Sequence, residues 1–174
     1  KRRDVMRKIG LFYDMIWTYG PPDFYDPLTG LDVPANVRAK MRYVGFLQRS
    51  LSHEPVSEHR PEGDYLLVTT GGGGDGSDLI HDVIHAYQQD PELTHKALVV
   101  LGPYMPAKKR RKLLKKGGAI PHLRMIEFDN RMEELIAGAS GVVAMGGYNT
   151  YCEILSFDKP ALIVPRVQPR EEQL

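Results

Sequence analysis

Two glycine-rich turns carry the residues best suited to hold a phosphate group. The first, TTGGGGDGSD (69–78), follows an apolar run and precedes a helix-like pattern, and the second, AMGGYNTYCEIL (144–155), does the same. Glycines let the backbone approach a ligand closely, and a helix N-terminus offers free N–H groups and a partial positive charge to an anion. Both turns therefore indicate a binding site for an anion.

The first turn matches nucleotide-binding templates only in part. Three of its glycines fit the dinucleotide fingerprint G-x-G-x-x-G, namely Gly71, Gly73 and Gly76, and another set fits G-x-G-x-G, namely Gly72, Gly74 and Gly76. The acidic residue expected about 20 positions later would be Asp90 or Glu92, in the loop before the next strand. No Lys-Ser or Lys-Thr follows the glycines, which excludes a P-loop.

Two interpretations of the first turn remain open. The glycines either bring the backbone close to a ligand, or they form a tight strand-to-helix turn in which a side chain caps the helix. The candidate caps are Asp75, Ser77 and Asp78.

The second turn places small polar side chains and a carboxylate at the start of its helix. Asn149 and Thr150 lie where their side chains and the helix N–H groups suit a phosphate. Glu153 follows Thr150 at the spacing of a capping box, in which its carboxylate would bond to the backbone of its own helix. Alternatively, the same carboxylate could accept hydrogen bonds from both hydroxyl groups of a ribose.

An alternation of strand-like and helix-like segments positions these turns. Apolar runs predict strands at 65–70, 96–102, 123–128, 141–146 and 161–165. Helix-like segments lie between them, at Asp78–Gln89, Pro106–Lys116, Met132–Ala139 and Tyr148–Ser156. This alternation predicts parallel βαβ units, and continuously apolar strands predict a sheet covered on both faces. We therefore expect an α/β fold, a Rossmann-like parallel sheet with helices on both faces.

Ligands of such sheets bind at the carboxyl ends of the strands. This directs attention to the turns at 70–77, 102–106, 128–131 and 145–150. The chain before the sheet is less regular, and it predicts a strand at 13–20, a loop at 21–34, a short helix at 34–41 and a strand at 42–47. The polar segment 50–63, with its two prolines, is the best candidate for a linker.

Composition excludes several classes of protein. The 174 residues include 23 basic and 22 acidic side chains, and the net charge of +1 favours no charged partner. No apolar run approaches the roughly 18 residues of a membrane span. Asp14 interrupts the apolar part of the basic start, so we expect no signal peptide. The single cysteine, Cys152, rules out an internal disulfide and fits the reducing cytoplasm.

The segment 64–174 resembles the donor-binding domain of GT-B glycosyltransferases, the C-terminal domain of glycosyltransferase family 28. The resemblance rests on GGGGDG, IEFDNRMEELIAGASGVVAMGGYNTYCEIL and DKPALIVPRVQPREEQL. The segment is similar to the group that contains the lipid-intermediate N-acetylglucosaminyltransferase of peptidoglycan synthesis. Within that group it is most similar to an uncharacterised bacterial branch of predicted glycosyltransferases. The resemblance implies one half of a GT-B fold. Residues 1–49 would be the tail of the N-terminal acceptor domain and a crossover, 50–63 the linker, and 64–174 a donor-binding domain that is incomplete at its C-terminus.

The resemblance also implies roles for individual residues. Glu153 matches the ribose-binding glutamate, and Phe128 and Asp129 match the position where the backbone contacts the uracil edge. The turn that receives the phosphates is matched by Gly146, Gly147, Tyr148, Asn149 and Thr150. Gln173 matches a polar residue near the donor sugar or ribose, and Arg49 matches an interdomain arginine that reaches the phosphates. The first turn would face the interdomain cleft and approach the distal phosphate through Gly72, Gly73, Gly74 and Gly76.

Two departures from the family pattern concern the donor and the chemistry. Met145 stands before Gly146, where the family often has serine. The polar turn PREEQ has fewer Gln and His residues than the corresponding turn of the family. Because of these departures, the resemblance does not identify the donor sugar. The catalytic base of the family usually comes from the N-terminal domain, of which only YDMIWTYG and RYVGFLQR are recognisable. We therefore interpret the chain as a fragment, assign no catalytic residue to it, and expect it to bind donor with little turnover.

The expected function is transfer of a sugar from a nucleotide-sugar, preferably a UDP-sugar, to a polysaccharide, lipid-linked or small-molecule acceptor. The resemblance implies an inverting displacement without a metal or other cofactor, in which helix N-termini and an arginine stabilise the leaving diphosphate. Three alternatives remain open: a nucleotide-sugar hydrolase or epimerase on the same fold, a non-catalytic nucleotide-sugar-binding subunit of a split transferase, and an NAD-binding protein.

A dense basic run, KKRRKLLKK (108–116), suggests a further partner. As a helix it would turn Leu113 and Leu114 inward and leave its cations in solvent, or the cations could contact anionic lipid at the inner face of a membrane. We expect no nucleic-acid partner, because the rest of the chain is charge-balanced. His81 and His85 have a spacing that suits metal binding, but no third ligand stands out, so we expect no metal site.

Overall fold

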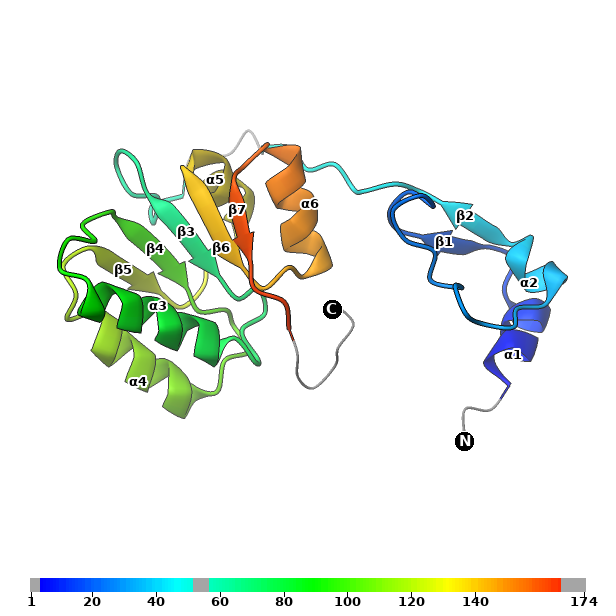
Figure 1. Ribbon diagram of the computed structural model, residues 1–174, viewed down its shortest axis with the longest axis horizontal. Helices are drawn as coiled ribbons and strands as arrows, with labels where there is room; N and C mark the ends of the chain where they lie inside the picture. The colour runs from blue at the N-terminus through cyan, green and yellow to red at the C-terminus, as the bar shows by residue number, and fades with distance from the viewer. Residues whose placement is uncertain (1–3, 52–56, 167–174) are drawn as a thin grey trace. The chain divides into compact units, whose positions relative to one another are not determined.

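The computed structural model describes residues 4–51 and 57–166 (Figure 1). The chain divides into two compact units, Lys1–Leu47 and Gln48–Leu174. Each unit has its own sheet, with two strands in the first unit and five in the second among the described residues.

The first unit combines two short parallel strands with two helices. Its elements are α1 (Val5–Phe12), β1 (Ile16–Thr18), α2 (Ala35–Arg38) and β2 (Met41–Tyr43). The Lys40 ammonium donates to the carbonyl oxygens of Gly10 and Tyr13, at 2.6 and 2.7 Å. A cation thus satisfies carbonyl groups at the C-terminal end of α1, where the helix dipole favours it.

The strand predicted at 13–20 and the short helix at 34–41 are confirmed, although each is shorter than its prediction. The strand predicted at 42–47 is present but ends at Tyr43 and begins one residue earlier, at Met41. Helix α1 was not predicted. None of its residues is buried, and Gly10 in its interior disfavours a helix. The contacts from Lys40 that hold its end come from 27 to 30 positions away, which no local pattern reveals.

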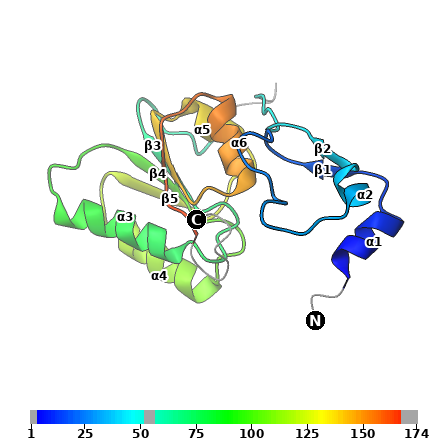
Figure 2. The same ribbon diagram turned by 45° about the vertical axis from the view of Figure 1, so that its right-hand side comes forward.

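The second unit is a parallel sheet with the strand order β5-β4-β3-β6-β7. Its strands are β3 (Leu66–Thr69), β4 (Ala97–Val100), β5 (Leu123–Ile126), β6 (Gly141–Ala144) and β7 (Ala161–Ile163). Its helices are α3 (Ser77–Gln89), α4 (Ala107–Gly117), α5 (Met132–Gly138) and α6 (Tyr148–Ser156). Figures 1 and 2 show α3 and α4 on one face of the sheet and α5 and α6 on the other. The predicted α/β fold is confirmed, strand by strand and helix by helix.

Alternate residues of the central strands enter two hydrophobic clusters, one under each helical layer. The cluster under α5 and α6 includes Leu67, Leu98, Val100, Leu135, Ile136 and Val142. The cluster under α3 and α4 includes Val68, Ile80, Ile84, Ala97, Val99 and Leu113. Because successive strand residues point to opposite faces, a continuously apolar strand is what this double burial requires.

The glycine loop after β3 is packed tightly against the loop after β4. The Thr70 hydroxyl donates to the Leu101 carbonyl oxygen at 2.8 Å. A Cβ atom on Gly73, whose φ is +81°, would lie 2.2 Å from that same carbonyl oxygen. A Cβ atom on Gly76 would lie 2.2 Å from the Thr70 Cβ. Two of the glycines are therefore required by packing alone.

Replacing Gly73 or Gly76 by alanine is expected to lower the free energy of unfolding by at least about 2 kcal/mol, because the new methyl group overlaps fixed atoms. Gly74→Ala is the matched control, since nothing lies within 4 Å of its Cβ position. We expect it to change stability by less than about 0.5 kcal/mol. Urea denaturation measures all three variants, and equal stabilities would contradict the close packing of this loop.

Candidate functional site

The carboxyl ends of the strands bring the predicted binding turns to one edge of the sheet. Strand β3 pairs with both β4 and β6, so the loop after β3 lies between the turns that follow these neighbours. A Cβ atom on Gly71 would lie 4.0 Å from the Thr150 hydroxyl oxygen. The two glycine-rich turns are therefore adjacent parts of one surface.

The second turn begins α6 with backbone groups alone. Gly146 has a φ of +69°, and Gly147 is the N-cap residue, so no side-chain cap bond is present. The first N–H groups of a helix have no partner within it, which suits them to bind an anion. Thr150 lies inside the first turn rather than at the N-cap, so the capping-box alternative for Glu153 is wrong.

Helix α3 also has a glycine at its N-cap position. Its N-cap residue is Gly76 and it has no side-chain cap bond, so of the tight-turn alternative the close packing is present but the cap by Asp75, Ser77 or Asp78 is wrong. Asp75 instead forms an ion pair with Arg166 at 2.6 Å. Gly71, Gly72 and Gly74 remain exposed in this loop, whereas Gly73 and Gly76 are buried.

The Glu153 carboxylate is buried inside the site. Only 8% of the residue is exposed. Burial is the main cause that raises the pKa of Glu153 to about 7, the nearby Glu133 carboxylate adds to it, and the Arg49 guanidinium opposes both. No described residue donates a hydrogen bond to this carboxylate. Its capacity to accept hydrogen bonds is therefore available to a ligand.

Arg49 forms hydrogen bonds with both ends of α6. Its backbone N–H donates to the Ser156 hydroxyl at 2.8 Å, and its Nη2 donates to Asn149 Oδ1 at 3.2 Å. The Arg49 Nε is buried without a partner in the part of the chain that the structure describes. The helix N-terminus, the guanidinium and the Glu153 carboxylate thus occupy one small region.

A cavity of about 390 Å³ lies at the turn after β5. It is lined by Ser57, Glu58, His59, Phe128, Asp129, Asn130 and Arg131. Phe128 is 51% exposed and its ring can cover a flat ligand, whereas Asp129 is buried. The wall of the cavity therefore comes from two segments about 70 positions apart.

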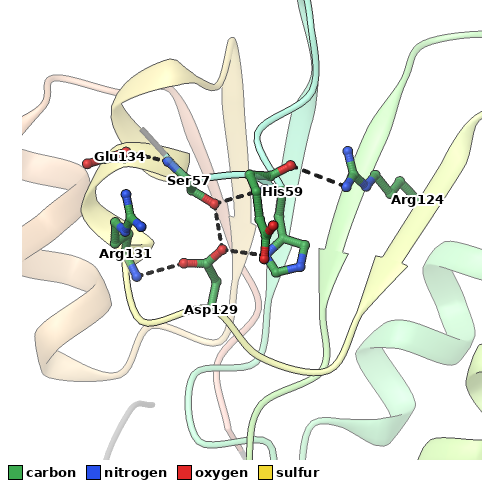
Figure 3. A network of polar contacts seen from close by, with 7 residues as sticks. Ser57, His59, Arg124, Asp129, Arg131 and Glu134 are labelled. Carbon is green, nitrogen blue, oxygen red and sulfur yellow. Dashed lines mark hydrogen bonds and ion pairs between the residues drawn. The ribbon is translucent and has the colours of Figure 1, made fainter. Parts of the chain in front are cut away.

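Asp129 connects these two segments (Figure 3). It accepts hydrogen bonds from the Ser57 hydroxyl at 2.6 Å and from the Arg131 backbone N–H at 2.7 Å, and His59 Nδ1 lies 2.7 Å away. Burial favours the neutral acid, but these three contacts outweigh it and lower the pKa of Asp129. The Ser57 backbone N–H also donates to Glu134 Oε2, at 2.8 Å.

Electrostatic interactions and one hydrogen bond connect the parts of the site. Glu133, in the first turn of α5, is close enough to raise the pKa of Glu153, and α5 starts at the cavity. Glu153 in turn lies near Arg49, which contacts Asn149 at the start of α6. Glu153 is therefore coupled electrostatically to α5, which starts at the cavity, and to Arg49, which contacts the start of α6.

The structure places the residues matched to the family at this edge, except that Gln173 lies outside the described residues. Ser57 and His59 were missed, because the polar segment 50–63 was interpreted as a linker. Their contacts with Asp129 span 72 and 70 positions, so no local signal identifies them. The turn at 102–106 contributes packing against the glycine loop rather than a predicted binding residue.

A parallel α/β sheet with helix N-termini and a buried carboxylate at its carboxyl edge has the architecture of a nucleotide-binding domain. The model of the glycosyltransferase family 28 C-terminal domain matches residues 66–174. The chain belongs to this family, as its sequence motifs indicated.

Two kinds of relatives agree with this assignment. An uncharacterized glycosyltransferase of Methanosarcina acetivorans is 26% identical over 148 residues, which cover 83% of this chain and 37% of the relative. The glycosyltransferase SnogD from Streptomyces nogalater aligns with a TM-score of 0.50 at 15% identity, over 84% of this chain and 35% of its own. The structural likeness concerns the fold, which is that of GT-B glycosyltransferases. The chain thus spans little more than a third of the length of these relatives.

The raised pKa of Glu153 predicts that stability falls as the pH rises. Between its ordinary value of 4.5 and about 7, the unfolded chain releases this proton before the folded protein does, which favours unfolding. The free energy of unfolding falls by an amount on the order of 3 kcal/mol, and the fall is complete above the pKa that Glu153 has in the folded protein. Glu153→Gln stays neutral, so we expect it to be more stable than the wild type at about pH 8.

Urea denaturation across this pH range measures the effect, and Asp129→Asn is a control of opposite sign. The lowered pKa of Asp129 means that its contribution to stability is present at neutral pH and is lost as the pH falls through the folded pKa. Asp129→Asn should therefore be less stable than the wild type at neutral pH. Parallel pH profiles for Glu153→Gln and the wild type would show that Glu153 does not ionise as a buried group.

Proposed function

We propose that this chain binds the nucleotide-sugar donor of a glycosyltransferase, preferably a UDP-sugar. The observation that carries the proposal is the buried Glu153 carboxylate, to which no described residue donates a hydrogen bond and which is coupled to Glu133 of α5 and to Arg49. A nucleoside diphosphate would fit these groups with its base in the cavity, its ribose on the carboxylate and its phosphates at the N-terminus of α6.

The proposed phosphate site is the turn Gly146–Thr150 together with Arg49. Backbone N–H groups and the helix dipole attract the diphosphate, and the guanidinium adds a positive charge. Gly71 lies beside Thr150, and together with the other exposed glycines of the first turn, Gly72 and Gly74, it would let the backbone approach the distal phosphate. Phe128 and the backbone of Asp129 border the base.

The proposed reaction is a direct displacement at the anomeric carbon of the sugar. An acceptor hydroxyl attacks, the bond to the diphosphate breaks, and the anomeric configuration inverts. Negative charge grows on the leaving diphosphate, where the helix N-terminus and Arg49 stabilise it more strongly in the transition state than in the ground state. The base that removes the acceptor proton is assigned to no residue of this chain.

Glu153→Ala is expected to weaken the binding of UDP by at least about tenfold, because two hydrogen bonds from the ribose hydroxyls to a carboxylate are lost. Calorimetric titration measures this with UDP, GDP, TDP and NAD in parallel. Glu62→Gln, which alters an exposed carboxylate outside the site, is the control and should bind UDP like the wild type.

The Arg49→Ala variant separates the phosphate site from the ribose site in the same titration. It should weaken the binding of UDP by a larger factor than that of uridine, since uridine has no phosphate. Failure of every nucleoside diphosphate to bind would refute the proposal, as would a Glu153→Ala variant with wild-type affinity. Binding of NAD in preference to UDP would favour the dinucleotide alternative.

A hydrolase or epimerase on the same fold would use this donor site in the same way. These enzymes differ from a transferase in the acid or base group that lies over the anomeric carbon. That group determines whether water, an acceptor or a proton shift completes the reaction. A binding subunit of a split transferase would likewise bind donor and require a second chain for turnover. Sugar transfer is favoured because family membership is shown for the domain itself.

Helix α4 presents a second, separate surface. Its residue Leu113 is buried against the sheet of the second unit, whereas Lys108, Arg111, Lys112 and Lys115 are exposed. No helix in the described part of the chain is long and apolar enough to cross a bilayer. We infer that these cations hold a cytoplasmic protein against the anionic inner face of a membrane, where a lipid-linked acceptor would be found.

Binding of the protein to vesicles that contain anionic phospholipid should exceed its binding to purely zwitterionic vesicles and should fall at high salt. Exchange of Arg111, Lys112 and Lys115 for glutamine is expected to abolish the difference, and sedimentation with the vesicles measures it. UDP affinity serves as the control and should not change. Equal sedimentation with both kinds of vesicle would refute the membrane contact and show that these cations only keep this face of the helix in solvent.

A further inference from the structure

The cavity after β5 contains a histidine whose ring is held in one orientation. His59 lines this cavity, and its side chain is 31% exposed. Its Nδ1 lies 2.7 Å from Asp129 Oδ2, and its backbone N–H donates to the Ser57 hydroxyl at 3.1 Å. The Ser57 hydroxyl donates in turn to Asp129 Oδ2, at 2.6 Å. Both the backbone and the ring of His59 are therefore fixed by the same carboxylate.

The contact with Asp129 determines where the ring carries its proton. Three contacts keep Asp129 ionised, and an ionised carboxylate can only accept hydrogen bonds. His59 Nδ1 must then be the donor. In the neutral ring this leaves Nε2 with a lone pair, so Nε2 is an acceptor.

The Nε2 atom is available to a ligand. Figure 3 shows it on the side of the ring that is turned away from Asp129. No residue of the described ranges 4–51 and 57–166 forms a hydrogen bond with it. A fixed acceptor with no partner, on the wall of a cavity of about 390 Å³, suits an N–H donor on a flat heterocycle.

We propose that His59 reads the nucleobase of the donor, by accepting through Nε2 the ring N–H of a lactam edge. This inference rests on the proposed function, because it places the base of a nucleoside diphosphate in this cavity. The lactam N–H is present in uracil, thymine and guanine, and it is absent from cytosine and adenine. Asp129 and Ser57 act as positioning residues that fix the ring for this contact.

Two substitutions separate base reading from a purely structural role of His59. The side-chain amide of His59→Asn can replace Nδ1 as donor to Asp129 but has no atom at Nε2. The amide of His59→Gln reaches the position of Nε2 but does not replace Nδ1. Base reading predicts that UDP affinity falls about tenfold in His59→Asn and less in His59→Gln. A structural role predicts the reverse order.

Ligands that lack the N–H complete the test. N3-methyl-UDP has a methyl group in place of the lactam proton, and ribose 5-phosphate has no base. Wild type and His59→Asn should bind each of these ligands equally well, which would localise the loss to the N–H contact. Parallel titrations with TDP, GDP and CDP then identify which lactam base is preferred, and CDP should show no difference between the two proteins.

His95→Asn is the matched control, since His95 is exposed before β4, at the opposite edge of the sheet. It should bind UDP like the wild type. A wild-type protein that binds no nucleoside diphosphate would overturn the proposed function together with this inference. UDP binding that His59→Asn leaves unchanged, or an equal loss for UDP and N3-methyl-UDP, would overturn this inference alone.

Discussion

The parallel sheet of the second unit requires cover on both faces, and this requirement determines where the site lies. The strand backbones pair within the sheet, and the apolar side chains enter two clusters beneath the helices. Backbone groups without partners then remain mainly where the strands end and the next helices begin. Because all five strands are parallel, these places meet at one edge. The suitability of that edge for an anion thus follows from the topology.

The same requirement explains why the fold could be predicted so well from the sequence. A strand buried on both faces is a short, continuously apolar run, and five such runs were visible between helical segments. Helix caps were harder to predict. Asp75, Ser77 and Asp78 are the right types of residue for a cap, but Gly76 holds that position because the Thr70 side chain leaves no room for a Cβ atom. Tertiary packing overruled local preference here.

Glu153 shows the same conflict between local and tertiary information. Its spacing from Thr150 fits a capping box, yet the N-cap residue of α6 is Gly147, so Glu153 lies in the second turn and is buried. A buried carboxylate without a hydrogen-bond donor destabilises a fold. Such groups are found mainly where a ligand completes their bonding, and perturbed pKa values therefore concentrate at functional sites. The structure thus strengthens the functional alternative that the sequence left open.

The contacts around Asp129 mark the limit of what the sequence reveals. Ser57 and His59 lie in a polar segment between two prolines, a composition typical of a linker, and only the folded chain brings them to a carboxylate about 70 positions away. Once there, the network does more than join two loops. An ionised Asp129 forces the His59 proton onto Nδ1 and thereby makes Nε2 an acceptor. Base recognition would then depend on a buried carboxylate that never contacts the base, since it is this group that determines the tautomer of the histidine that does.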